Sequence, residues 1–453
     1  MLIKIILGLI GLGIVVFIHE LGHFIAAKKA GIHVEVFSIG WGKKLFSFTR
    51  QGTEYRISLI PIGGYCKMKG DDLLKEAIEK DSDKIPDEEN SFFSASPWRR
   101  IFVGFAGPFF NFLFAIASLS LVWFIGFTTY TYGNNIVIAS EFSETEKTFP
   151  AEKAGLKTGD KIISIEGNKI EHYNDLQKAI APNPNKKLTM LVLRDGEEIE
   201  IDVTPRLNPD TGAGQIGTYA WIEPIIGKVR EGSPAHMAGL KSGDEIIAVN
   251  DKEIKHAMQF QYMLKNANNK VDIDYLRDGS KQNSTMVIDY NENGAPNTGI
   301  QFKHLAFTNQ TLNPAKALFN GTKQTLSILG ITVKSLGVLF QGVNLQKAVQ
   351  GPLRITYYIG DVAAQGFSSG IHQGFNSIIT FLSLLSVALC FMNLLPIPAL
   401  DGGLILLFLV EGIIIRKPLS PKVIARYQAI GMFIVLGLIF FAIAGDILFL
   451  ANR

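Results

Sequence analysis

The chain has 453 residues, of which 47% are hydrophobic and 19% are charged, and its mean hydropathy is +0.21. This composition is too apolar for an ordinary soluble enzyme, yet the middle of the chain is polar, so we expect a membrane protein with a soluble insert. The formal net charge of +3 is too small to indicate a nucleic-acid partner. The two cysteines, Cys66 and Cys390, give no disulfide framework, because Cys390 lies in a hydrophobic stretch.

The first predicted span, residues 1–30, carries the motif His19-Glu20-Leu21-Gly22-His23 inside an apolar run. Two imidazoles four residues apart share one helix face and can chelate one metal ion, while Glu20 can act as base for a water molecule on that ion. A charged residue in a bilayer-length helix is unfavourable by about 2.5–3.5 kcal/mol, so such residues are usually functional. The alternative is a soluble core helix with incidental histidines.

A β-hairpin is predicted at about residues 52–69, within a cytoplasmic-side loop of residues 31–100. Residues 53–60 alternate in polarity, and Ile57 and Leu59 lie on one side of that strand. A turn that contains Gly63 and Gly64 leads to a second short strand, residues 65–69. From the residues alone, a hairpin that dips into the membrane and a hairpin on the surface are equal alternatives.

The second predicted span, residues 101–131, is followed by an insert that repeats itself. Ala154-Gly-Leu-Lys-Thr-Gly-Asp160 recurs as Ala238-Gly-Leu-Lys-Ser-Gly-Asp244, and Leu-Arg-Asp-Gly recurs later in each copy. Each copy has a glycine-containing turn, an alternating strand, a short helical stretch and strands joined at Asp-Gly. This pattern resembles the PDZ domain, so we expect two mixed α+β PDZ domains, at residues 136–222 and 223–306. Such domains bind extended peptides at a sheet edge; the alternative is that they act only as steric gates.

The C-terminal third contains two further predicted spans. Lys323 and Lys334 interrupt the apolar stretch before them, so we expect amphipathic interfacial helices in residues 307–372 rather than a fifth span. The third span covers residues 373–402 and the fourth covers residues 428–450, with a cytoplasmic segment of residues 403–427 between them. Asp446 near the end of the fourth span is expected at the membrane interface.

Asp401 is the best candidate for a third metal ligand, because two imidazoles seldom complete a catalytic zinc site. Pro396 and Pro398 interrupt helical hydrogen bonding, and the following Gly402-Gly403 lets the backbone bend, so Asp401 can turn inward. The alternative is that Asp401 is a solvated cap of the cytoplasmic loop. Asn393, about two helical turns earlier, is expected to hydrogen-bond the substrate or to join two helices.

Basic residues predict the orientation of the spans. They gather in residues 28–44, 99–100 and 416–426, whereas each terminus offers one, Lys4 or Arg453. By the positive-inside rule, the loops that carry them are cytoplasmic. Both termini and the insert are then outside, and the His19 motif lies towards the cytoplasmic side.

Three motifs together resemble the site-2 protease family of intramembrane zinc metalloproteases. They are His19-Glu-x-x-His23, Gly107-Pro-x-x-Asn111 and Asn393-x-x-Pro-x-Pro-x-Leu-Asp-Gly402. The resemblance implies that His19, His23 and Asp401 hold Zn²⁺ and that Glu20 activates water. Gly107, Pro108 and Asn111 are expected to permit close helix contact near the site, and Asn111 is a candidate neighbour of the metal ligands.

The resemblance also implies a function, a location and a role for the hairpin. We expect hydrolysis of single-span membrane proteins in a bacterial inner membrane: an anti-sigma factor already cut outside, in the envelope stress response, and signal-peptide remnants. The lipid bilayer and candidate peptide ligands of the PDZ domains are the other expected partners. A substrate helix must unwind before cleavage, and the hairpin edge is expected to hold the unwound strand, with Ile57, Leu59, Gly63 and Gly64 as substrate-binding residues.

Two other functions compete with this interpretation. A metal-ion transporter would have polar groups lining several spans, but the second and fourth spans are nearly free of ionisable residues. A catalytically inactive membrane scaffold with PDZ domains would not need the intact set His19, Glu20, His23 and Asp401. The first repeat has Phe149 where the second has Ser233, so the two domains are expected to differ in ligand preference.

Overall fold

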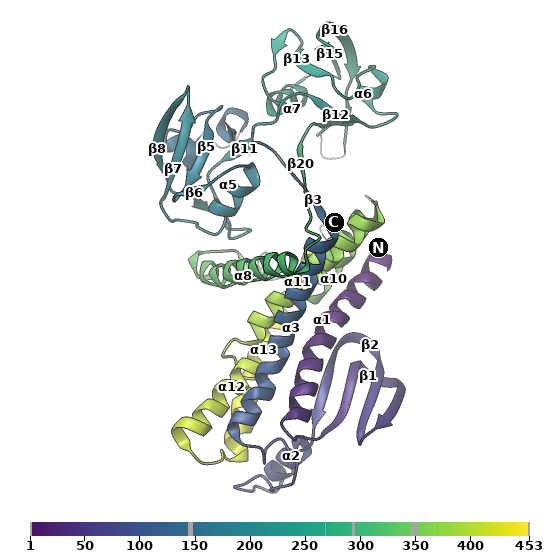
Figure 1. Cartoon of the computed structure of the whole chain (residues 1–453), viewed down its shortest axis with the longest axis vertical. Coiled ribbons are helices and arrows are strands. Elements are labelled where there is room, and N and C mark those ends of the chain that lie inside the picture. The colour runs from purple at the N-terminus through teal and green to yellow at the C-terminus, as the bar shows by residue number, and fades with distance from the viewer. Residues whose placement is uncertain are drawn as a thin grey trace. The chain divides into compact units, whose positions relative to one another are not determined.

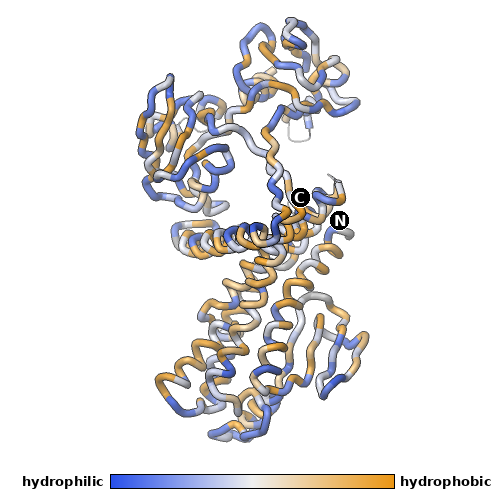
Figure 2. The backbone as a smooth tube through the Cα atoms, in the orientation of Figure 1, coloured by the Kyte–Doolittle hydropathy of each residue, from blue (hydrophilic) through white to orange (hydrophobic). Residues whose placement is uncertain are grey.

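Four helices in the described part of the chain are long and apolar enough to cross a membrane, so the predicted number of spans is confirmed. They are α1 (Leu2–Lys29), α3 (Pro97–Ile125), α11 (Ile371–Asn393) and α13 (Pro421–Ala451). Figure 2 shows that hydrophobic residues dominate these helices. Large apolar side chains remain exposed on them, such as Phe433 at 78% and Phe440 at 70%. An exposed apolar surface of this kind is typical of contact with lipid.

The computed structural model describes residues 2–143, 148–267, 269–291, 295–345, 351–368 and 370–451. The chain divides into two compact units. The first unit comprises Met1–Phe127, Asn309–Leu339 and Asn344–Arg453, and the second comprises Thr128–Thr308 and Phe340–Val343. The four long helices belong to the first unit, and the repeated insert belongs to the second (Figure 1).

Two spans end earlier than the sequence predicted. α3 starts at Pro97, because proline suits the first helical turn, and it ends before Gly126, whose φ is 96°. α11 ends at Asn393, and residues 394–400 form a non-helical loop. A new helix, α12 (Asp401–Leu409), then begins at Asp401 and continues into a π-helical segment, η3 (Val410–Ile415). The predicted continuation of the third span to residue 402 is therefore wrong, and Asp401 starts a helix rather than ending one.

The helix α8 (Pro314–Val338) runs across the direction of α3 in Figure 1. Gly321 permits the crossing, because a Cβ there would come within 2.3 Å of Ser120 Oγ. Trp123 of α3 donates a hydrogen bond from Nε1 to Oε1 of Gln324 at 2.8 Å. Leu318 and Phe319 are exposed at 54% and 67%. α8 is not one of the candidate spans among the described helices, and its location at the membrane surface remains a prediction.

Asp446 holds the start of α10 (Pro352–Ser368). Its fully buried carboxylate accepts hydrogen bonds from the backbone N–H groups of Gly351 and Leu353, both at 3.0 Å, and of Arg354 at 3.1 Å. A carboxylate at this position satisfies donors that a helix start leaves free. Asp446 is thus a structural residue inside the protein, and its location at the membrane interface stays a prediction. α10 also meets α1 closely, since a Cβ on Gly360 would come within 1.9 Å of the Lys4 carbonyl oxygen.

The predicted hairpin is part of a larger strand pair, β1 (Val34–Arg50) and β2 (Thr53–Met68). Phe37 of β1 pairs with Tyr55 on one side and with Cys66 on the other. The two halves of β2 therefore flank the first part of β1 and do not pair with each other. The prediction of a hairpin between residues 53–60 and 65–69 is wrong, because the preceding segment supplies their common partner.

The second unit contains two separate hydrophobic cores, one for each sequence repeat. Each has a four-stranded antiparallel sheet, in the order β6-β5-β7-β8 or β14-β13-β15-β16. The repeated Gly-Asp and Arg-Asp-Gly motifs meet in both copies. Arg194 binds the buried Asp160, and Arg277 binds the buried Asp244, each through Nε and Nη2 at 2.7 Å. This shared ion pair explains why the two motifs recur together.

The remaining helices and strands complete both units. They are α2 (Asp71–Glu79), β3 (Phe127–Thr131), β4 (Ile136–Ile138), η1 (Ala139–Phe142), α4 (Pro150–Lys153), β5 (Lys161–Ile165), β6 (Asn168–Lys169), α5 (Tyr173–Ile180), β7 (Leu188–Arg194), β8 (Glu197–Val203), β9 (Arg206–Leu207), β10 (Gly214–Gln215), β11 (Thr218–Ala220), β12 (Ile226–Val229), α6 (Pro234–Met237), β13 (Glu245–Val249), β14 (Lys252–Glu253), α7 (Ala257–Lys265), β15 (Lys270–Arg277), β16 (Ser280–Val287), β17 (Asp289–Tyr290), β18 (Pro296–Asn297), β19 (Ile300–Phe302), β20 (Leu305–Asn309) and η2 (Leu339–Gln341).

Candidate metal centre

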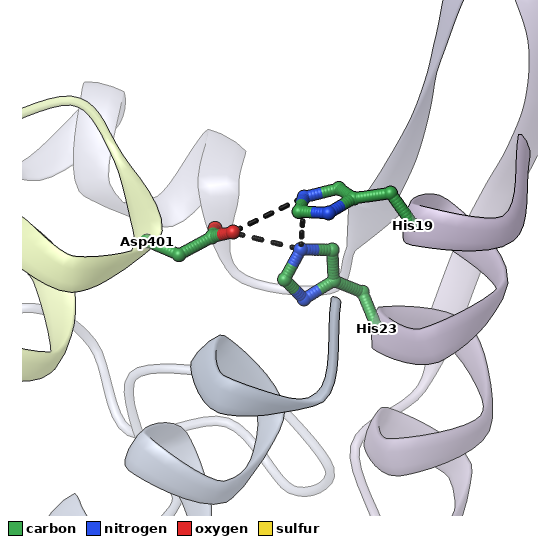
Figure 3. Close-up of side chains that lie close together, drawn as sticks. All are labelled: His19, His23 and Asp401. Atoms are coloured by element: carbon green, nitrogen blue, oxygen red, sulfur yellow. Dashed lines mark hydrogen bonds and ion pairs between the residues drawn. The ribbon is translucent and has the colours of Figure 1, made fainter. Parts of the chain in front are cut away.

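His19 and His23 on α1 face Asp401 at the start of α12 (Figure 3). The Nε2 atom of His19 lies 3.1 Å from Oδ2 of Asp401, and Nε2 of His23 lies 3.4 Å from Oδ1. The two Nε2 atoms are themselves 3.1 Å apart. One ligand atom from each of the three residues lies within 4.8 Å of the other two. The structure therefore brings together the three residues that the sequence singled out as metal ligands.

The chemistry of these three side chains fits a catalytic zinc ion. Two imidazole nitrogens and one carboxylate oxygen are the ligand set of a catalytic zinc site, in which a fourth position would be left for water. Both histidines are buried, and the buried Oδ2 of Asp401 accepts no well-formed hydrogen bond from any described residue. A buried carboxylate oxygen without a donor is costly unless a cation balances it. The convergence of lone pairs and negative charge therefore suits a divalent cation.

The helices α1 and α3 approach each other closely at two glycines, and the lack of a side chain at Gly107 leaves space for the imidazoles. A Cβ on Gly107 would come within 2.3 Å of His23 Nε2 and 2.8 Å of His19 Cε1. On the facing helix, a Cβ on Gly22 would come within 2.4 Å of the Ala106 carbonyl oxygen. Neither position has room for a side chain, so both must be glycine. The expectation that residues 107–111 permit a close helix contact near the site is thus met at Gly107.

The loop between α11 and α12 turns Asp401 towards α1. A Cβ on Gly402 would meet the Leu394 carbonyl oxygen at 2.2 Å, and a Cβ on Gly403 would meet the Ile397 carbonyl oxygen at 2.1 Å. The loop therefore folds back over the first turn of α12, which only residues without side chains allow. As the first residue of that helix, Asp401 also lies where the helix dipole favours a negative charge.

Glu20 shares a cavity of about 280 Å³ with the three candidate ligands. Cys66 on β2 lines the same cavity as Glu20. Gly64 lies beside the Glu20 side chain, since a Cβ there would be 3.4 Å from Glu20 Cγ. The strand pair therefore contacts the predicted base directly, and Glu20 is held beside the candidate metal position.

The predicted substrate-binding residues divide into two groups. Asn393, the last residue of α11, has its Nδ2 atom 3.4 Å from His19 Nε2, and Gly64 contacts Glu20. Ile57 and Leu59 are exposed on β2 at 49% and 57%, and Gly63 lies against Trp41. None of the five is among the described residues that line the cavity, so the division rests on the contacts of Asn393 with His19 and of Gly64 with Glu20. The structure thus places two of the five at the site and three along the adjoining strand.

Four polar or thiol-bearing residues of the cavity were not found from the sequence: Cys66, Asp71, Arg100 and Gln428. Arg100 is buried and pairs with the equally buried Glu411 of η3, where Nη1 donates to Oε2 at 3.2 Å. Burial raises the pKa of Asp71 to about 6. Arg100 was interpreted only as a basic residue that sets orientation, and no local signal linked it to Glu411.

The sequence pattern of peptidase family M50 matches residues 7–438. A protein of Treponema pallidum that is a zinc metalloprotease by name is 37% identical over 99% of this chain and 100% of its own length. The "Regulator of sigma E protease" of Haemophilus influenzae is 30% identical, and the "Protease RseP" of Yersinia pestis is 29% identical, each over 97% of both chains.

Among solved structures, the PDZ domain of the SdrC-like protein from Listeria monocytogenes is matched over 90% of its length. It covers 18% of this chain at 18% identity, and the TM-score of 0.17 is too low to support an argument about the insert.

Proposed function

The chain belongs to peptidase family M50, the site-2 proteases, and on that premise we propose that it is an intramembrane zinc endopeptidase. The observation that carries this proposal is the convergence of His19 and His23, on a helix apolar enough to cross a membrane, with Asp401 of α12, beside Glu20. His19, His23 and Asp401 would hold the zinc ion. When bound, the ion supplies a Lewis acid that activates water and polarises the scissile carbonyl group.

In this proposal the chain's own residues handle the proton. Glu20 takes a proton from the attacking water and later gives it to the nitrogen of the leaving amine, so that one peptide bond is replaced by a carboxylate and an amine. The close approach of Gly64 on β2 to the Glu20 side chain keeps this carboxylate beside the three candidate ligands. Asn393, close to His19, is placed to donate its amide N–H to the carbonyl oxygen of the substrate.

We propose single-span membrane proteins as substrates, among them anti-sigma factors already cut outside the membrane and signal-peptide remnants. The named activity of the relatives in sigma-E regulation supports the first class. An unwound substrate segment needs backbone partners that lipid does not offer. The strand pair beside Glu20 would offer such partners, with Ile57, Leu59, Gly63 and Gly64 along its course. The enzyme would lie in a bacterial inner membrane, with both termini and the insert in the periplasm.

We propose that the two halves of the insert are PDZ domains and that the second one binds peptide termini. In the second half, a groove of about 670 Å³ lies between α7 and residues 295–302. Gly299 there, with φ at +74°, contacts the small Ser233. The matching Gly217 in the first half contacts the ring of Phe149, which reaches into a groove of about 500 Å³. The aromatic ring supports a first domain with less room for a peptide.

The experiment that tests the proposed activity is a cleavage assay with the purified full-length protein in lipid. Candidate single-span proteins are incubated with it in the presence and absence of a chelator, and the products are mapped by mass spectrometry. We expect one internal cut that the chelator abolishes. Glu20→Gln should retain zinc and lower the cleavage rate by about 10²–10⁴-fold. Cleavage at the normal rate by Glu20→Gln would exclude Glu20 as the base.

A further inference from the structure

The helix α3 presents a hydrogen-bonding group to each of the two histidines on α1. Nδ1 of His23 lies 2.8 Å from the carbonyl oxygen of Val103, to which it donates when protonated. Nδ1 of His19 faces the side-chain amide of Asn111, with 3.4 Å between Nδ1 and Nδ2. Residues 103 and 111 lie about two helical turns apart and therefore share one face of α3. The far ring nitrogen of each imidazole is thus contacted from the same helix.

Asn111 is completely buried, and one of its polar atoms has no partner. The side chain has no exposed surface, and its Oδ1 atom accepts no hydrogen bond from any described residue. A buried amide oxygen without a donor is unfavourable, because it has lost water and gained nothing in return. The oxygen and nitrogen ends of an amide have the same shape, and a half-turn about the last side-chain bond exchanges them.

If His19 binds a metal ion, its Nδ1 atom requires the oxygen end of the Asn111 side-chain amide. Nε2 of His19 faces Asp401 and His23, so it is the nitrogen that a metal ion would use. A neutral imidazole that binds a metal through Nε2 carries its proton on Nδ1. Nδ1–H is a donor and requires an acceptor, which the NH₂ group of Asn111 cannot be. When the Asn111 amide is rotated by half a turn, Oδ1 faces His19 and accepts a hydrogen bond from Nδ1–H. The buried Oδ1 atom then has a donor.

We propose that Asn111 is a positioning residue that accepts a hydrogen bond from Nδ1–H of His19 and so fixes the tautomer that presents Nε2 to the metal. This inference rests on the proposed metal function. Val103 plays the same part for His23 with its backbone carbonyl. A third helix holds the backbone of Asn111 in place, since the Ser386 hydroxyl of α11 donates a hydrogen bond to the backbone carbonyl oxygen of Asn111 at 2.9 Å. The histidine ligands thus lie on α1, and groups of α3 determine which ring nitrogen of each imidazole carries the proton.

Two substitutions of Asn111 distinguish a role in helix packing alone from a role as the hydrogen-bond acceptor for His19. Leucine has the branching of asparagine with a larger volume and no polar atom, so a site that needs only packing tolerates Asn111→Leu better than Asn111→Asp, which would bury a carboxylate. A site that needs an acceptor for His19 rejects leucine and tolerates aspartate, because a carboxylate–histidine pair also orients a zinc ligand. The order of the two variants therefore separates the two roles.

Asn376 offers a matched control on another helix. It is nearly as buried, at 6% exposure, and its Nδ2 donates to the Gly126 carbonyl oxygen at 2.6 Å, so it joins two helices without contacting the metal ligands. Asn376→Leu makes the same chemical change at a buried amide that has only a structural partner. Any loss shared by Asn111→Leu and Asn376→Leu would come from helix packing.

The experiment measures zinc affinity of the full-length protein by competition with a chromophoric chelator, beside the thermal unfolding midpoint of each variant. We expect Asn111→Leu to weaken zinc binding by about 10–100-fold, Asn111→Asp to remain within a few-fold of the wild type, and Asn376→Leu to bind as the wild type does. If Asn111→Leu does not fold, Asn111→Ala takes its place in the comparison with Asn111→Asp, and the same order is expected.

Two results would overturn the inference while leaving the metal site intact. One is a wild-type zinc affinity in Asn111→Leu, or in Asn111→Ala where the leucine variant does not fold. The other is a loss in Asn111→Asp as large as in the variant without an acceptor. A wild-type protein that binds no zinc would refute the proposed function itself, and this inference with it.

Discussion

Oδ2 of Asp401 lies 3.1 Å from Nε2 of His19, although the two residues come from opposite ends of the chain. The contact depends on a loop that folds back over α12 at Gly402 and Gly403 and on a backbone crossing of α1 and α3 at Gly22 and Gly107. Glycines without functional groups therefore determine whether the functional groups meet. This arrangement makes the metal site sensitive to changes in residues that bind nothing.

Gly107→Ala should disable the site without removing any ligand. Its new Cβ would come within 2.3 Å of His23 Nε2, and the imidazole must move away from Asp401. We expect zinc affinity, measured by chelator competition, to fall at least about tenfold. Gly437→Ala is the control, since a Cβ there meets nothing within 4 Å. Equal zinc affinity in Gly107→Ala and the wild type would show that the imidazoles have more room than the structure indicates.

Asp401→Ala should lower the zinc content of the purified protein from about one ion per chain to well below that value, because two imidazoles alone seldom hold a catalytic ion. Metal analysis of the protein after dialysis measures the change. Asp81→Ala removes a carboxylate that is 79% exposed and should leave the zinc content as it is. An unchanged stoichiometry in Asp401→Ala would remove this residue from the ligand set.

The second half of the insert should lose stability in mild acid because of His256. This side chain is buried against the rings of Trp221 and Phe142, and burial lowers its pKa from 6.5 to about 4. The unfolded chain therefore binds the proton more readily than the folded one. The stability from this residue is fully present above pH 6.5 and is lost as the pH falls towards 4, by at most about 3 kcal/mol.

Hydrogen exchange of α7 at pH 7.5 and at pH 5 measures this effect in the full-length protein. His256→Asn keeps a side chain that can cap α7 and removes the titration, so its exchange should vary less between the two pH values. Equal pH dependence in His256→Asn and the wild type would assign the effect to other groups.

Peptide binding should distinguish two glycines that occupy matching places in the insert. Gly217 and Gly299 both have φ near +80° and both lie directly against a neighbouring side chain, Phe149 or Ser233. We expect Gly299→Ala to weaken the binding of a peptide with a free carboxyl terminus by roughly tenfold, about 1.4 kcal/mol, and Gly217→Ala to change it little. Fluorescence anisotropy with the full-length protein provides the measurement. A larger effect at Gly217 would assign the peptide to the first half.

The sequence predicted the parts of this structure that depend on local properties. The lengths and apolarity of the four spans and the spacing of His19 and His23 are readable without tertiary contacts. Asp401 was also found, because a carboxylate after a long uncharged run needs a partner. The helical structure of residues 403–415 is not predicted, since this apolar segment is too short to span a membrane and lies in the expected cytoplasmic segment.

Other features were not predicted because they depend on pairing between separate segments of the chain. β1 is a strand because both halves of β2 flank it, and nothing in residues 34–50 alone indicates two partners. Asp446 is buried because the start of α10, far away in sequence, offers it three N–H groups. The ion pair between Arg100 and Glu411 likewise joins residues that only the folded chain brings together. Contacts of this kind leave no periodic pattern in the sequence.

X-ray absorption spectroscopy of the zinc-loaded full-length protein tests the central claim most directly. We predict a first coordination sphere with two imidazole nitrogens at about 2.0–2.1 Å and carboxylate and water oxygens, with no sulfur although Cys66 lines the same cavity. His19→Ala should remove one imidazole from the spectrum. A zinc spectrum without histidine scattering, or one dominated by a thiolate, would contradict the claim that His19, His23 and Asp401 hold the ion.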